Sequence, residues 1–440
     1  MSGVFLVSLG CPKNLVDTEL LAGALLSSNR HITFDDRQAD IYIINTCAFL
    51  PEARGEAAAE LTDAVEWKRA VPGRKIAVAG CLMNHPQFPE FKEHFKEVDL
   101  WCQINDTARL RELLINGATP SPAGEKCTYL CNESMPRIQL TLPHVAYLKI
   151  CDGCNNRCSY CAIPALRGEL RSRRLQSVIS EAETLIANGV KELIVIAQDI
   201  TAYGHDLNSG ETLAKLLAEL ENLPGDFVIR LLYTHPAHYT DELIGVLAKS
   251  AKILPYLDMP LQHISDRILT AMNRHTDSAS IKTLIAKLRS SIPQLTLRTT
   301  FITGLPGETE TEFEELCQFV KDSGFERMGV FAFAPEPGTP AAVMPDQIPL
   351  EIAEERAAKL MDIQKNIMKR SQRKKIGSSM RLLIDQIDGG VAYARGASDA
   401  PDIDNIIMLN ARRTMKPGMF INAKIIKAAG SDLIAEKTGK

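Results

Sequence analysis

The chain has 440 residues, 45% of them hydrophobic, and a formal net charge of −4 at pH 7. This length predicts two to four domains with large cores, and the near-neutral charge argues against a protein that holds nucleic acid by charge alone. The sequence contains no run of 18 apolar residues and no basic signal-peptide segment, so we expect a cytoplasmic protein whose eleven cysteines serve metal or redox chemistry rather than disulfides.

Residues 4 to about 120 alternate short apolar runs with longer amphipathic stretches. Short, near-continuous apolar runs indicate buried parallel strands, and the stretches between them indicate helices. The expected strands are Val4–Leu9, Asp40–Thr46 and Lys75–Ala79, and the expected helices are Asn14–Leu26 and Glu52–Arg69. The β-α-β-α order predicts an open α/β sheet over residues 1–120.

A cysteine follows each of these three strands, namely Cys11, Cys47 and Cys81. The carboxyl ends of parallel strands line the ligand crevice of an open sheet, so residues far apart in sequence can converge there. A single cysteine in such a position is more often an ordinary small buried residue. Three cysteines in equivalent positions favour a shared metal cluster.

Residues 121–140 are irregular in pattern and begin with a proline- and glycine-containing stretch, which predicts a linker. Cys127 and Cys131 lie in it with C-x3-C spacing and no third partner nearby, and we interpret them as structural. The region that follows, residues 141–375, repeats strand then helix six times, which fits an incomplete (β/α)6 barrel. The expected strands are 145–151, 192–198, 227–233, 256–261, 296–303 and 327–334, and the helices include 177–188, 240–250, 278–290 and 309–322.

A long helix is expected from Leu350 to about Lys375. Its basic residues predict a solvated face, in preference to a contact with ribosomal RNA or an acidic partner. These residues are Lys365, Lys369, Arg370, Arg373, Lys374 and Lys375.

Residues 376–440 change to short alternating runs with glycine, aspartate and proline turns. The runs predict five strands that close into a small β-barrel. With nine Lys/Arg and seven Asp/Glu, this module does not have the charge of a strongly electropositive RNA-binding domain. The expected strands are 379–387, 391–395, 405–410, 419–427 and 432–436.

The loop after the first barrel strand carries Cys154, Cys158 and Cys161 with C-x3-C-x2-C spacing. Three thiolates this close can hold one iron–sulfur cube and leave its fourth iron open for a substrate or cosubstrate. A zinc site would need a fourth ligand and usually shows paired C-x2-C or C…H spacing. Cys151 could close the cube and make the domain an electron carrier, but it ends the predicted strand, and we expect it to face the barrel wall.

This loop, with its flanks from Leu148 to Arg173, resembles the methylthiotransferase branch of the radical S-adenosylmethionine (SAM) enzymes. The resemblance extends over essentially the whole chain, and residues 376–440 resemble the TRAM domain of that family. It implies two [4Fe–4S] clusters, one on Cys154, Cys158 and Cys161 and an auxiliary one on Cys11, Cys47 and Cys81. The first cluster would bind SAM and support its one-electron cleavage to a 5′-deoxyadenosyl radical.

Polar segments at the ends of later barrel strands match the same family in order and position. Their candidate cofactor contacts are Gln198, Asp199, Gln262, Arg298, Gly304 and Glu308, and His263 is as readily structural as functional. A basic group after the cluster loop, made of Arg167, Arg171, Arg173 and Arg174, could clamp the carboxylate of SAM or of a substrate, although Arg173 and Arg174 fit a solvated helix start equally well.

Two segments resemble the branch of the family that modifies a ribosomal protein, residues 256–274 and 399–404. The resemblance implies addition of a methylthio group to the β-carbon of an aspartate in a small-subunit ribosomal protein, free or on the ribosome, with sulfur from the auxiliary cluster. It also implies an electron donor such as flavodoxin or ferredoxin, while charge gives little support for contact with RNA. Two alternatives stay open: a transfer-RNA adenosine methylthiotransferase, and a non-enzymatic iron–sulfur or zinc protein.

Overall fold

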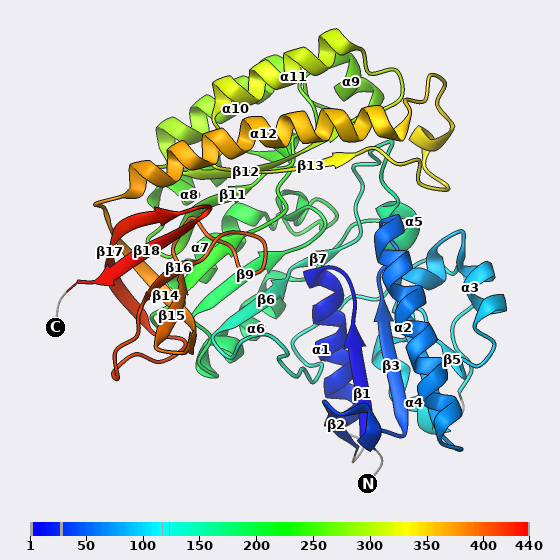
Figure 1. Cartoon of the computed structure of the whole chain (residues 1–440). Helices are drawn as coiled ribbons and strands as arrows, with labels where there is room; N and C mark the ends of the chain where they lie inside the picture. Colours follow the sequence, from blue (N-terminus) through cyan, green and yellow to red (C-terminus); the bar gives the residue numbers. More distant parts are fainter. Residues whose placement is uncertain (1–2, 27–29, 117, 123, 439–440) are drawn as a thin grey trace.

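A computed structural model describes residues 3–26, 30–116, 118–122 and 124–438 of the chain. Two parallel sheets and one closed barrel follow one another along the sequence (Figure 1). This arrangement confirms the predicted mixed α/β fold with an open N-terminal sheet, an incomplete barrel and a C-terminal β-barrel. Among the described residues, no helix combines the length and the apolar character that crossing a membrane requires.

The N-terminal sheet has five parallel strands in the order β2-β1-β3-β4-β5. The order reverses between β1 and β3, and ligands of open α/β sheets bind at such a switch point. The pattern did not reveal β2 and β5, because runs of three and two residues are too short to show a period. The elements are β1 (Gly3–Ser8), α1 (Pro12–Leu26), β2 (His31–Thr33), β3 (Ile41–Thr46), α2 (Pro51–Ala70), β4 (Lys75–Gly80), α3 (Phe88–His94), β5 (Leu100–Trp101) and α4 (Leu110–Asn116).

Helices cover both faces of this sheet, which is why its strands are apolar at consecutive positions. In β3, Ile41 and Ile43 pack in one core with α1 and α4. The alternate residues Tyr42 and Ile44 pack in another core with α2. The strand ends are therefore held between two packed layers.

The central sheet has six parallel strands in the order β13-β12-β11-β10-β9-β6, and β13 and β6 remain its two edges. The strands are β6 (Val145–Lys149), β9 (Glu192–Ile196), β10 (Val228–Leu231), β11 (Ile253–Asp258), β12 (Thr296–Thr303) and β13 (Arg327–Ala332). The helices are α6 (Leu175–Ala187), α7 (Leu213–Asn222), α8 (Asp241–Lys249), α9 (Asp266–Ala271), α10 (Ser278–Ser291) and α11 (Glu310–Ser323). A short hairpin, β7 (Cys151–Asp152) with β8 (Arg171–Ser172), encloses the cysteine loop and α5 (Ile163–Arg167).

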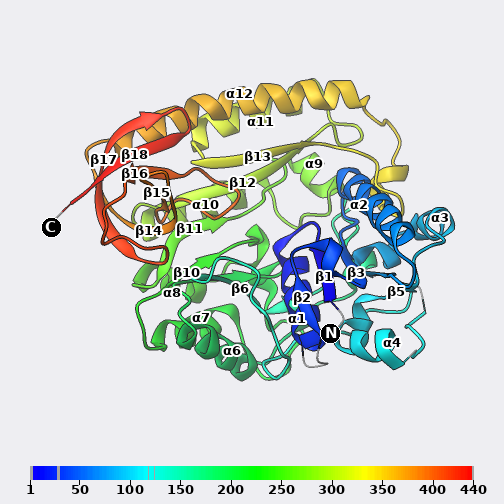
Figure 2. The same ribbon diagram turned by 60° about the horizontal axis from the view of Figure 1, so that its bottom comes forward.

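The helix α12 (Leu350–Lys375) runs along β13 and leads into the C-terminal barrel, as both views show (Figures 1 and 2). Of its basic residues, Lys375 is half-buried and donates to Ser398 Oγ, whereas the others are exposed. The barrel closes in the order β14-β15-β16-β18-β17. Its strands are β14 (Ser379–Asp388), β15 (Val391–Arg395), β16 (Ile407–Asn410), β17 (Phe420–Ala429) and β18 (Asp432–Lys437).

The acidic loop of the barrel binds the central sheet. Arg327 Nη2 at the start of β13 lies 2.5 Å from Asp399 Oδ1, and the Tyr256 hydroxyl donates to Asp404 Oδ2 at 2.6 Å. Residues 399–404 of this loop resemble the ribosomal-protein branch of the family, but their partners within the chain could not be predicted from the sequence. Its aspartates hold the barrel on the sheet.

Between α4 and β6 the described residues form neither helix nor strand, yet they are held by specific contacts. Glu19 of α1 is fully buried and accepts from Arg137 Nε at 2.8 Å and from the backbone N–H of Leu140 at 2.7 Å. Cys127 and Cys131 are both buried there, and Cys127 Sγ accepts from an Arg171 Nη at 3.3 Å. These contacts agree with our structural interpretation of the two cysteines.

Candidate functional site

Cys11, Cys47 and Cys81 end neighbouring strands and converge at the switch point of the N-terminal sheet. Gly10 has φ +87°, and a Cβ built on it would lie 2.3 Å from Cys47 Cβ. Gly80 has φ +106°, and its Cβ would lie 2.3 Å from the carbonyl oxygen of Thr46, the residue before Cys47. The two glycines therefore let the three cysteine loops approach closely.

Replacing Gly10 by alanine should destroy this convergence. The matched control is Gly73→Ala, which has φ +89° but no atom within 4 Å of the added Cβ. The control should lose only the free energy that a left-handed backbone conformation costs an alanine, about 1–3 kcal/mol of unfolding free energy. Gly10→Ala should lose more stability than the control and should also lose the iron that this trio is predicted to hold, measured as iron per chain. Equal losses in both variants would contradict the close packing.

The second trio lies in a loop that the backbone closes tightly. Gly153 has φ +77°, and a Cβ on it would come within 2.0 Å of the carbonyl oxygen of Glu169. The backbone N–H of Cys154 donates to Gly168 at 3.2 Å, and that of Cys161 donates to Cys158 at 3.1 Å. The loop is thus bent back on itself, with its three thiols on one short segment.

Neighbouring side chains and burial set the chemistry of these thiols. Arg274 Nη1 lies 3.5 Å from Cys158 Sγ and can donate to it. Burial raises the pKa of Cys154 to about 11 and that of Cys161 to about 12. Burial likewise raises the pKa of Cys81 to about 12. Metal binding must therefore drive the deprotonation of Cys154, Cys161 and Cys81.

The spacing of the thiols argues against a single metal ion. Two thiolates on one zinc ion lie within about 4.6 Å of each other, because Zn–S bonds are about 2.3 Å long. Among the described residues no three thiols come within 4.8 Å of one another; the group that does so is Asp199, His235 and His238. The donor sets, three thiols each at wider spacing, fit polynuclear iron–sulfur clusters better than zinc.

Cys151 lies apart from the loop trio. It is fully buried in the core of the central sheet, and its Sγ contacts the carbonyl oxygen of Asp199 at 3.8 Å. This position agrees with the expectation that Cys151 faces the barrel wall. The open-cluster interpretation therefore keeps three cysteines.

Buried polar atoms without partners follow the ends of the barrel strands. Gln198 Oε1 and Gln262 Oε1 are acceptors with no hydrogen-bond partner among the described residues. His235 Nε2 also has none, but it is a donor, because Nδ1 of the ring accepts from the Ala237 backbone. Gln262 also has φ +73°, a strained conformation that is typical of functional sites. The amino group and ribose hydroxyls of SAM are donors that such acceptors can bind, so Gln198 and Gln262 fit SAM.

Asp199 is held in place by its neighbours rather than left open. Its Oδ2 accepts from Asn156 Nδ2 at 2.8 Å and lies 2.9 Å from His238 Nδ1, and its Oδ1 accepts from the Thr201 backbone at 2.9 Å. Although burial alone would raise it, hydrogen bonding by His238 and the charge of His235 lower the pKa of Asp199 to about 2. Because Asn156 belongs to the cluster loop, Asp199 anchors that loop to β9.

Gly304 and Glu308 make contacts within the chain, and their predicted cofactor contact stays a prediction. Glu308 is buried and accepts from Arg356 at 2.8 Å and from the Gly304 backbone at 2.5 Å, and it lies 3.1 Å from His263 Nε2. A Cβ on Gly304 would lie 2.3 Å from Ala353 Cβ. Both residues therefore serve the packing of α12, and His263 is structural. The sequence alone could not distinguish a cofactor contact from a packing contact here, because the partners Ala353 and Arg356 lie on α12, some 40 residues later.

The Arg298 guanidinium is also engaged within the chain. Its Nη1 lies 2.9 Å from Asp258 Oδ1, and about a fifth of the side chain remains exposed. Burial opposes the charge, but Asp258 and Tyr256 raise the pKa of Arg298 above its ordinary value. A cofactor contact by Arg298 stays a prediction.

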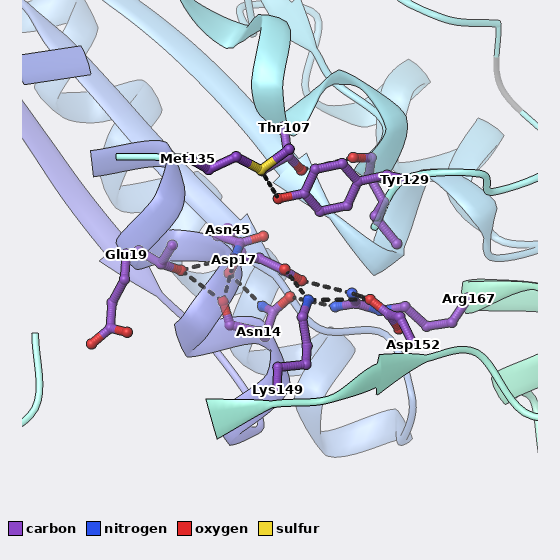
Figure 3. Close-up of polar contacts among 12 residues, drawn as sticks. Asn14, Asp17, Glu19, Asn45, Thr107, Tyr129, Met135, Lys149, Asp152 and Arg167 are labelled. Atoms are coloured by element: carbon purple, nitrogen blue, oxygen red, sulfur yellow. Dashed lines mark hydrogen bonds and ion pairs between the residues drawn. The ribbon is translucent and has the colours of Figure 1, made fainter. Parts of the chain in front are cut away.

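A buried charged network links α1 of the N-terminal unit to β6 and α5 of the central unit (Figure 3). Arg167 Nε donates to Cys81 Sγ at 3.2 Å, while its Nη1 lies 2.6 Å from Asp17 and 3.2 Å from Asp152. Lys149 binds the same two carboxylates from β6. The Arg167 guanidinium, predicted to bind a carboxylate of SAM or substrate, therefore binds Asp17 and Asp152. These two partners were not predicted from the sequence. Lys149, at the end of the apolar run of β6, was the sequence signal for buried carboxylates, because a buried lysine needs an anionic partner.

The remaining arginines of the predicted clamp are also committed within the chain. Arg173 is buried and pairs with Glu181. Arg171 donates to the backbone of Glu169 at 2.7 Å, and Arg174 donates to Ser209 at 3.2 Å on the surface. Arg167 and Arg173 thus bind carboxylates of the chain itself, and a clamp on the carboxylate of SAM or of a substrate stays a prediction.

Replacing Arg167 by methionine should destabilise the protein strongly. It leaves two buried carboxylates with one cation fewer, which typically costs about 3–5 kcal/mol. The control is Arg267→Met, whose pair with Glu312 is more than half exposed on the arginine side and is worth about 1 kcal/mol or less. Denaturant unfolding measures both variants. Equal, small losses would show that the network at Arg167 does not hold the two units together.

The open six-stranded sheet and its three-cysteine loop define a protein of the radical SAM class. Residues 148–320 match the radical SAM superfamily, residues 3–103 match the uncharacterized protein family UPF0004, and residues 376–437 match the TRAM domain. Among solved structures, the radical SAM methyltransferase TsrM from Kitasatospora setae shares the fold at a TM-score of 0.58 and 16% identity, over 81% of this chain and 78% of that one.

Relatives that match over nearly the whole chain identify the family within the radical SAM class. The chain is 41% identical to "Ribosomal protein uS12 methylthiotransferase RimO" of Geotalea uraniireducens (strain Rf4), over 98% of both chains. It is 40% identical to the protein of that name from Akkermansia muciniphila, over 98% of this chain and 99% of the relative. The chain belongs to the ribosomal protein uS12 methylthiotransferase RimO family.

Proposed function

We propose that the protein adds a methylthio group to the β-carbon of an aspartate in ribosomal protein uS12. The observation that carries the proposal is the full-length match to uS12 methylthiotransferases, together with two three-cysteine sets in one chain. The SAM cosubstrate and both [4Fe–4S] clusters follow from the same family. Residues 1–120 would hold the auxiliary cluster, 121–140 link, 141–375 hold the SAM site, and 376–440 form the TRAM domain.

Cys154, Cys158 and Cys161 would hold the cluster that, when bound, supplies one-electron cleavage of SAM. The chain's own residues bind and orient the cosubstrate. Gln198 and Gln262 offer unpaired buried acceptors beside it. Asp199, fixed by His238, keeps Asn156 and so the cysteine loop in place.

Cys11, Cys47 and Cys81 would hold the auxiliary cluster, the proposed source of the transferred sulfur. Arg167 fixes the distance between the two cysteine trios. It ends α5, which begins two residues after Cys161, and the Arg167 guanidinium contacts Cys81. The substrate carbon would lie between the trios. The reaction space would thus lie at the packed contact between the N-terminal and central sheets.

The proposed partners follow from the substrate and the chemistry. An electron donor of the flavodoxin or ferredoxin kind would reduce the first cluster. The substrate uS12 would place the enzyme in the cytoplasm, and the exposed basic face of α12 is where ribosomal RNA would meet it if uS12 is modified on the ribosome.

An anaerobic assay of the reconstituted protein tests this function. Protein, SAM, sulfide and a reductant are incubated with either uS12 or transfer RNA, and each product is weighed by mass spectrometry. We expect uS12 to gain one methylthio group in place of one hydrogen, and transfer RNA to remain unchanged. A gain on transfer RNA alone would overturn the substrate and favour the adenosine-modifying alternative.

A non-enzymatic metal protein is distinguished by metal content. Two cubes correspond to about eight iron atoms per chain, and about four should disappear with either trio. Zinc in place of iron, or iron that cannot bind SAM, would favour the non-enzymatic class.

A further inference from the structure

Lys13 carries a buried positive charge at the junction of the two units. It lies in the first turn of α1, two residues after Cys11, and only 8% of its surface is exposed. Its Nζ lies 3.3 Å from the centroid of the Tyr233 ring, which follows β10 of the central sheet. A cation–π contact recovers only part of what an ammonium group loses on leaving water.

Three other cations at this junction are paired with carboxylates of the chain. Lys149 and Arg167 share the two aspartates shown in Figure 3, and Arg298 binds Asp258 at 2.9 Å. Lys13 makes neither an ion pair nor a hydrogen bond with any residue that the structure describes. It is therefore the cation of this group that contacts no carboxylate directly, although Cys11 and Asp258 lie near enough to favour its charge.

Tyr233 supports the same position from the other unit. Its φ of +67° is a left-handed conformation that a tyrosine adopts only where its surroundings impose it. The backbone N–H of Tyr233 donates to Asp258 Oδ2 at 3.3 Å, which fixes the turn, and the ring is left to cover the Lys13 ammonium. The Lys13 ammonium and the Tyr233 ring thus meet where the Cys11 loop contacts the carboxyl end of β10.

We propose that Lys13 binds the side-chain carboxylate of the substrate aspartate and selects aspartate over asparagine. This role rests on the proposed function. The reacting β-carbon is bonded directly to the carboxyl carbon, so a carboxylate held at Lys13 places that carbon beside the Cys11 loop. A buried ammonium without an internal partner discriminates by charge, because the uncharged amide of asparagine has the same shape but cannot neutralise it.

The test measures binding without turnover. A fluorescent peptide that carries the target loop of uS12, with either aspartate or asparagine at the modified position, is titrated with the cluster-loaded enzyme under anaerobic conditions without reductant. The wild type should bind the aspartate peptide at least about 30-fold tighter than the asparagine peptide. Lys13→Met should bind both peptides equally weakly, and Lys13→Arg should restore the preference.

Controls separate this role from a structural one. Lys252→Met removes another ammonium that covers a ring, that of Phe227 at 4.4 Å, but it precedes β11 at the opposite end of the sheet, so the preference should remain. Iron content and the visible spectrum establish that each variant carries both clusters. If Lys13→Met lost the same factor with both peptides, Lys13 would serve the cluster on Cys11, and the proposal would be overturned.

If Lys13→Met does not assemble its clusters, the affinities of the wild type for the two peptides still test the role of Lys13. Equal affinity of the wild type for both peptides would overturn the role of Lys13 while leaving the proposed function intact. Failure of the wild type to bind either peptide and to modify uS12 would instead overturn the proposed function, and the role of Lys13 with it.

Discussion

Replacing Cys158 by alanine should reduce SAM cleavage to the level seen without enzyme. The middle cysteine of the loop cannot be replaced from nearby, because Cys151 lies in the sheet core and points to Asp199. A cube that has lost a ligand cannot present its open iron to SAM. The measurement is 5′-deoxyadenosine formed per enzyme under reducing conditions, together with a fall of about four iron atoms per chain.

Cys317→Ala is the matched control for Cys158→Ala. Cys317 is also a buried cysteine of the central unit, but it lies on α11 and packs in the core. This variant should lose a little stability and keep full SAM cleavage. Wild-type cleavage by Cys158→Ala would show that the loop does not hold the cluster that activates SAM.

Replacing Cys47 by alanine should separate the two activities. The auxiliary trio loses its central ligand, so transfer of the methylthio group should stop, while SAM cleavage at the other trio continues at a rate close to that of the wild type. Both quantities are measured in one incubation, as 5′-deoxyadenosine and as modified uS12. This division follows from the position of the two trios on separate sheets.

Cys102→Ala tests whether the effect belongs to the trio. Cys102 also follows a strand of the N-terminal sheet and is buried, but it packs in the core beside Ala77 and Ala79. We expect both activities to remain in this variant. If Cys47→Ala lost both activities while it kept its fold and its first cluster, separate roles for the two trios would be contradicted.

Local pattern predicted the elements that carry the cysteines. The strands before Cys11, Cys47 and Cys81 each contain four consecutive apolar residues, which is enough to show a buried strand, and a parallel sheet then brings their ends together. The spacing of Cys154, Cys158 and Cys161 needs no tertiary information, because the three lie within one loop. These features are encoded over short stretches.

Contacts across long separations could not be predicted. Asp17 and Arg167 are 150 positions apart, and only the packing of α1 against β6 brings them together. Gly304 looked like a ligand-binding glycine, but its missing side chain admits Ala353 of α12. Lys13 stands beside Cys11 in sequence, yet its lack of an internal carboxylate partner becomes visible only when the central sheet is placed opposite it.

The transfer of deuterium from uS12 to 5′-deoxyadenosine tests most directly the central claim, that the protein uses SAM to add a methylthio group to an aspartate of uS12. The substrate is uS12 carrying aspartate deuterated at the β-carbon, and the products are modified uS12 and 5′-deoxyadenosine. We predict one methylthio group on the aspartate and deuterium in the 5′-deoxyadenosine, since hydrogen removal and SAM cleavage occur at one site. Methylthiolated uS12 together with deuterium-free 5′-deoxyadenosine would contradict the account.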